Sequence, residues 1–204
     1  MDPSEFVDAV REENKTALSR LGASKALYAD TGGDLEDDAV LRAAADRAHH
    51  AAAVFETWAD EESGAVADLF ASAAASERDH VETVADHLDG YDPGDPPGVA
   101  THLEGVGDTD GRLGAFVGWV LAAGNNADQV VGYFVGQASP RTASTFREVS
   151  GDYDDYLDDA AAVVTETVDD PERAREAAGA AVQADYDDYF ETLEAMGVNP
   201  KPVC

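Results

Sequence analysis

Basic side chains are scarce in this sequence of 204 residues, which holds 13 lysines and arginines against 43 aspartates and glutamates. The lysines stand at positions 15, 25 and 201. Proteins that bind DNA or RNA gain much of their affinity from Lys and Arg side chains that neutralise phosphates. No window of this chain gathers several basic residues, so we expect no direct binding to nucleic acid.

The acidic excess gives the chain a formal net charge of −30. Molar salt shortens the Debye length to about 3 Å, so the repulsion between these charges nearly vanishes while the carboxylates keep the surface hydrated. The composition is typical of a protein made for molar intracellular salt. In dilute buffer the same charge should loosen the fold.

Cysteine is nearly absent, since Cys204 is the only one and the last residue of the sequence. It has no partner for an internal disulfide, so we expect a free thiol in a reducing cytoplasm, with a disulfide across a dimer as the alternative. The N-terminal MDPSEFVDAV lacks the basic and apolar regions of a signal peptide. No apolar run approaches the roughly 20 residues that span a bilayer. We therefore expect a cytoplasmic protein without a membrane segment.

Helical periodicity recurs along the chain, and no stretch shows the pattern of a β-strand. A first helix should start at Asp2 and Pro3 and continue with breaks to the glycines at 32 and 33. The last should be capped by Asp170 ahead of a proline. The further helices are expected at about 35–60, 64–88, 112–138, 142–168 and 171–196. Residues 89–111 are rich in proline and glycine, and we expect them to have no regular structure.

Short loops within each half and one long connection between the halves describe an all-α, ferritin-like four-helix bundle with additional terminal helices. Residues 1–204 are expected to form a single domain. It would consist of a helical hairpin at about 35–88, a crossover at 89–111 and a second helical half at 112–196.

Two polar residues, Glu77 and His80, interrupt the apolar face of the helix expected at 64–88. The face follows helical spacing through Val66, Phe70, Ala73, Glu77, His80, Val84 and Leu88, so the pair should point into the core. A buried carboxylate without a partner is costly. Glu77 therefore needs a metal, an arginine or hydrogen bonds that keep it neutral.

The stretch VFETWADEESGAVADLFASAAASERDHVETV, residues 54–84, resembles the first hairpin of rubrerythrin-like members of the ferritin-like superfamily from halophilic archaea. In that hairpin an aromatic-Ala-acidic turn precedes a helix with Phe, small residues and then Glu-x-x-His. The resemblance implies a diiron carboxylate bundle, in which each half contributes one helix with a lone Glu and one with Glu-x-x-His. Glu77 and His80 match the second of these helices.

The other ligand positions depart from this pattern. The lone Glu of the preceding helix should fall near 44–48, where the only carboxylate is Asp46, and His49 and His50 follow one turn later. Ser150 and Tyr153 occupy the places of the second Glu-x-x-His.

At most half of a diiron site is therefore expected. Glu77, His80, Asp46 and His49 are the candidate ligands of a single iron or zinc ion. Without a metal, Glu77 could pair with Arg47 or hydrogen-bond to His80 or Tyr153.

The sequence DYDDY occurs twice, at 152–156 and at 185–189. Its two tyrosines are three residues apart and share one helix face. We expect them to pack at the edge of the bundle while the aspartates point to solvent.

Three functions remain open. In the first, the bundle has lost redox chemistry and serves as a binding, regulatory or oligomeric scaffold. We expect the protein to form a homodimer. Alternatively it would hold a mononuclear or unusual dinuclear iron or zinc centre in oxidative defence or metal handling. That centre would need an outside electron donor, because the chain has no CxxC pair. A third possibility is a transcription regulator that acts through protein contacts.

Overall fold

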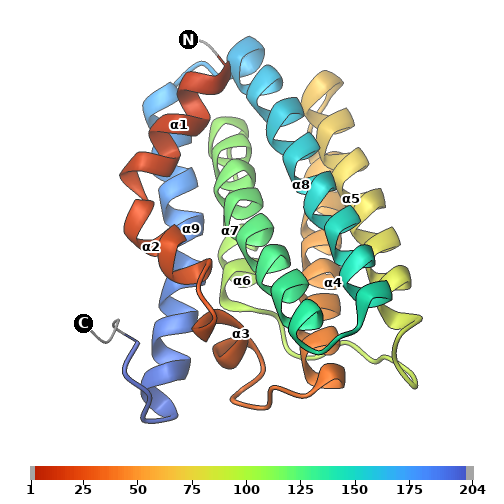
Figure 1. Cartoon of the computed structure of the whole chain (residues 1–204). Coiled ribbons are helices and arrows are strands. Elements are labelled where there is room, and N and C mark those ends of the chain that lie inside the picture. The colour runs from red at the N-terminus through yellow and green to blue at the C-terminus, as the bar shows by residue number, and fades with distance from the viewer. Residues whose placement is uncertain (1–2, 201–204) are drawn as a thin grey trace.

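The computed structural model describes residues 3–200, which form nine α-helices and no β-strand (Figure 1). The predicted all-α class is confirmed. Asp2 and Cys204, for which a helix cap and a free thiol were expected, lie outside these residues. The helices are α1 (Pro3–Glu13), α2 (Lys15–Leu21), α3 (Lys25–Asp30), α4 (Asp37–Glu61), α5 (Gly64–Ala85), α6 (Gly98–Glu104), α7 (Thr109–Gly136), α8 (Pro140–Thr167) and α9 (Pro171–Ala195).

The five long helices agree closely with the helices expected from periodicity. Aspartates cap two of them. The Asp108 carboxylate accepts a hydrogen bond from the Gly111 backbone N–H at the start of α7, and Asp170 accepts from the N–H groups of Glu172 and Arg173 at the start of α9. A short polar side chain at this position satisfies backbone donors that have no partner within the helix. The predicted cap at Asp170 is confirmed.

The crossover between the two halves contains a helix, so the prediction that 89–111 lacks regular structure is wrong over α6. Its apolar residues Val99, Ala100 and Leu103 are buried, and this burial stabilises a helix of only two turns. The segment before it is fixed to α4, because the Tyr91 O–H and the Gly94 N–H both donate to Asp46.

Helix α7 is the central element of the molecule, with α8 and α9 packed along its two sides (Figure 1). Every residue from 111 to 123 is buried, as expected for a helix that is apolar all round. The α4–α5 hairpin packs against this unit through contacts of α5 with α8 and of α4 with α7. Helices α1 and α2 pack on α8 and α9. None of the helices described is long and apolar enough to cross a membrane.

At two positions along their contact, α7 and α9 meet through backbone rather than through side chains. Gly114 faces the carbonyl group of Ala174, and Gly118 faces that of Ala178. A Cβ atom added at either glycine would overlap the opposing carbonyl oxygen. Glycine is therefore required at both positions for the two helices to approach this closely.

We predict that the fold depends strongly on salt. The net charge of −30 is screened in molar KCl, whereas at about 0.1 M salt the Debye length grows to about 10 Å and neighbouring carboxylates repel one another. Thermal unfolding followed by circular dichroism should be cooperative in molar KCl, and the melting temperature should fall markedly near about 0.1 M. A melting temperature that stays constant over this range would contradict the prediction.

Candidate functional site

Glu77 and His80 lie side by side on the inner face of α5. Their exposed fractions are 0% and 6%, so the prediction that both face the interior is confirmed. The unbroken spacing of buried residues along α5, from Val66 through Phe70 and Ala73, places them there. Helix α8 covers the pair.

The two side chains belong to a chain of polar contacts that starts at the surface. The Asp152 carboxylate on α8, with 46% of its side chain exposed, lies 2.8 Å from His80 Nε2. His80 Nδ1 lies 3.2 Å from Glu77 Oε1. The Tyr153 hydroxyl donates to Glu77 Oε2 over 3.4 Å. Of the partners foreseen for Glu77 in the absence of a metal, His80 and Tyr153 are therefore both in contact with it.

This region also holds three buried polar atoms without a hydrogen-bond partner in the described part of the chain. They are Glu77 Oε1, His80 Nδ1 and the Tyr156 hydroxyl oxygen. Glu77 Oε1 and His80 Nδ1 are close enough for an ionic contact, but they are not directed at each other as a hydrogen bond. Buried polar atoms are rarely left unpaired, so these three identify the Glu77–His80 pair as the candidate site.

Burial and the neighbouring carboxylates together set the pKa values of the site. It raises the pKa of Glu77 above its usual value. Burial alone would lower the pKa of His80, but the carboxylates of Glu77 and Asp152 beside it raise that pKa overall. Burial also raises the pKa of Tyr153 and of Tyr156, so both phenols stay neutral.

The remaining predicted ligands have other partners. Asp46 accepts hydrogen bonds from Tyr91 and Gly94 of the crossover. His50 Nε2 lies 3.0 Å from the Gly94 carbonyl oxygen, and the His49 ring packs edge-on against His50. Within residues 3–200, no three His, Cys, Asp or Glu side chains are placed to hold one metal ion. Asp46 and His49 therefore do not join Glu77 and His80.

The residues opposite the pair do not fit a diiron centre, which needs about six protein ligands. The rings of Tyr153 and Tyr156 from α8 pack there, with centroids 5.8 Å apart, and Trp119 of α7 meets Tyr153 at 5.6 Å. Ser150 donates to Asp128 instead of turning inward. An aromatic cluster fills the space that the ligands of the second half would occupy.

A second network, centred on the buried pair of Arg47 and Asp185, was not predicted from the sequence. Its guanidinium group makes two parallel hydrogen bonds of 3.1 Å to Asp185 on α9, and Nη2 lies 3.9 Å from Asp30. Asn126 of α7 donates to Asp30. Partial burial raises the pKa of Asp30 to about 6, although Arg47 opposes this shift and 24% of the Asp30 side chain stays exposed. The network joins α3, α4, α7 and α9.

These contacts correct two expectations. The pairing of Arg47 with Glu77 does not form, because Asp185 takes the guanidinium group. The aspartates of the DYDDY repeats do not all point to solvent, since Asp152 and Asp185, the first residue of each repeat, contact His80 and Arg47. Tyr153, Tyr156 and Tyr189 are buried rather than merely at the edge. The DYDDY repeat was the sequence signal that could have identified Asp152 as the partner of His80 and Asp185 as the partner of Arg47.

A comparison of the chain with known protein families, curated proteins and solved structures found no match. The resemblance of residues 54–84 to the rubrerythrin-like hairpin therefore stays an expectation from the sequence.

Proposed function

We propose that this protein is a ferritin-like bundle without redox chemistry that acts as a binding scaffold. One observation carries the proposal: the Tyr153 and Tyr156 rings pack against the Glu77–His80 pair where a diiron bundle would need carboxylates. A bundle that keeps one Glu-x-x-His and has aromatic rings opposite it cannot bridge two irons. The Glu77–His80 pair then has a structural role, because it connects α5 to α8 through Asp152.

A second candidate is a single metal ion at the same pair, and a specific feature favours it. Glu77 Oε1 and His80 Nδ1 are both without a hydrogen-bond partner and lie 3.2 Å apart, a separation that suits two ligands of one ion. His80 presents its other nitrogen to Asp152, as histidine ligands commonly do to a carboxylate. Such an ion would take Glu77 and His80 as its protein ligands, and water would complete its coordination.

Replacement of Glu77 by glutamine separates the two candidates. For a scaffold without metal, Glu77→Gln should leave the melting temperature unchanged or raise it slightly, because a buried ionisable group becomes a neutral one of the same shape. The protein should be purified in molar KCl, without added metal or a histidine tag, and its metal content measured by elemental analysis. The scaffold proposal predicts much less than one ion per chain.

Glu82→Gln is the matched control, since Glu82 is exposed on the same helix and its replacement should change neither quantity. One ion per chain that is lost in Glu77→Ala but kept in Glu82→Gln would favour the metal site over the scaffold. Two irons per chain would overturn both candidates.

A further inference from the structure

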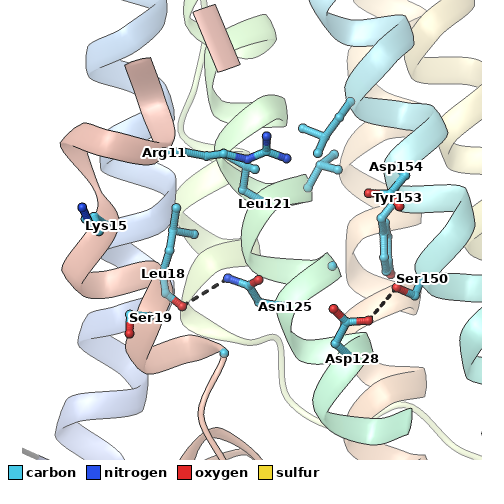
Figure 2. Close-up of a pocket in the computed structure, with 14 residues that line it drawn as sticks. Arg11, Lys15, Leu18, Ser19, Leu121, Asn125, Asp128, Ser150, Tyr153 and Asp154 are labelled. Carbon is cyan, nitrogen blue, oxygen red and sulfur yellow. Dashed lines mark hydrogen bonds between the residues drawn. The ribbon is translucent and has the colours of Figure 1, made fainter. Parts of the chain in front are cut away.

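A groove of about 640 Å³ opens between α1 and α2, α7 and α8 (Figure 2). This volume is in the range of sites that bind small molecules. The floor of the groove is apolar and consists of the buried side chains of Leu18, Val120, Leu121 and Leu157 and the ring of Tyr153. Gly124 on α7 leaves the space open because it has no side chain.

Arg11 supplies the positive charge on one wall of the groove. It extends from α1 across Leu121 toward α8 (Figure 2), whereas Lys15 of α2, which also lines the groove, pairs its ammonium group with Glu12. The only ion pair of Arg11 in the described part of the chain is a 3.7 Å contact with Asp8, and both side chains are largely exposed. Its guanidinium group therefore has donors available for an anionic ligand group.

The facing wall is acidic. Asp154 of α8 has no hydrogen bond or ion pair to any of residues 3–200. Asp128 of α7 accepts a hydrogen bond from Ser150 through Oδ1, which leaves Oδ2 for a ligand. Asn125, next to these residues, uses its amide N–H to bond the Leu18 carbonyl oxygen (Figure 2), so its own carbonyl oxygen is available as an acceptor.

We infer that this groove binds a small linear zwitterion, in which an apolar chain separates a carboxylate from an ammonium group. The carboxylate pairs with Arg11, the ammonium group with Asp128 or Asp154, and the chain lies on the apolar floor. Charges of opposite sign on facing walls select a ligand that carries both charges. This inference rests on the proposed binding role and names the ligand class for it.

Three probes that share one apolar chain test the inference: 6-aminohexanoate, hexanoate and hexylamine. Isothermal titration calorimetry in molar KCl should show binding of 6-aminohexanoate, with hexanoate and hexylamine each at least about tenfold weaker, because each lacks one charge-assisted contact. Equal binding of all three would show an apolar groove without charge selection. Binding of hexylamine as strong as that of 6-aminohexanoate would show simple attraction of cations to an acidic surface. Either result, or no binding of 6-aminohexanoate, overturns the inference.

Variants locate the ligand. Arg11→Gln should weaken the binding of 6-aminohexanoate at least about tenfold and leave the binding of hexylamine unchanged. The double variant Asp128→Asn with Asp154→Asn should also weaken the binding of 6-aminohexanoate at least about tenfold, but leave the binding of hexanoate unchanged. Arg147→Gln, an exposed arginine elsewhere on α8, is the charge control.

Gly124→Leu should fill the groove and abolish binding. Gly132→Leu places the same side chain on the same helix where a Cβ atom meets no neighbour, and it should bind as the wild type does. Loss of binding in Gly132→Leu, or its retention in Gly124→Leu, would place the ligand elsewhere. The metal content of the wild type is a separate measurement, so failure of the scaffold proposal is distinguishable from failure of this inference.

Discussion

Replacement of Gly114 by alanine should lower the free energy of unfolding by more than about 3 kcal/mol. Overpacking of a core commonly costs about 1–3 kcal/mol when side chains can shift. Here the added Cβ atom meets the backbone carbonyl of Ala174, which cannot move without displacing α9. Gly118→Ala should behave alike, because the Ala178 carbonyl lies opposite. Denaturant unfolding in molar KCl, followed by circular dichroism, measures both losses.

Gly132→Ala is the matched control on the same helix. Gly132 is exposed and a Cβ atom there meets nothing within 4 Å, so alanine should raise the free energy of unfolding by about 0.5–1 kcal/mol through its better helix propensity. If Gly114→Ala were as stable as Gly132→Ala, α7 and α9 would not be in backbone contact.

Arg47→Met should lower the free energy of unfolding by about 3–5 kcal/mol, because it leaves the buried carboxylate of Asp185 without its partner. Asp185 has an exposed fraction of 4%, and both of its oxygens bond to Arg47. Asp185→Leu should be destabilising but cost less, since Asp30 still lies 3.9 Å from the guanidinium group. Thermal and denaturant unfolding in molar KCl measure these losses.

The double variant Arg47→Met with Asp185→Leu should recover most of the loss. Removal of both charges eliminates the unpaired group, and apolar replacements of a buried ion pair are often neutral or stabilising. A double variant as unstable as the sum of the two single variants would mean that the residues do not act as a pair.

Much of the helical framework could be predicted from periodicity and capping residues. Asp170 before Pro171, for example, indicates the start of α9 by local chemistry alone. The same local signals failed at α6, where three apolar residues in a segment full of proline and glycine form a helix only because α4 and α9 offer a surface to pack on. Burial of this kind depends on neighbours that are distant in the sequence.

The candidate site was likewise predictable only in part. Helical spacing alone placed Glu77 and His80 inside. The partner of each buried charge depends on how one helix is rotated against another. A local sequence pattern does not predict this rotation. Asp152 and Asp185 therefore looked like ordinary surface aspartates, and Asp46 looked like a ligand although its carboxylate fixes the crossover.

The contact between Asp152 and His80 has a consequence for how fast the interior responds to pH. An imidazole ring can take up a proton at one nitrogen and release one from the other. Asp152 is partly exposed and adjoins Nε2, while Nδ1 adjoins Glu77. Glu77 can thus exchange its proton with bulk water while α5 and α8 stay packed, once a small rotation of the His80 ring turns Nδ1 toward Glu77 Oε1, 3.2 Å away. Its titration is expected to be faster than the opening of the bundle, in contrast to that of a carboxyl group that only local unfolding exposes.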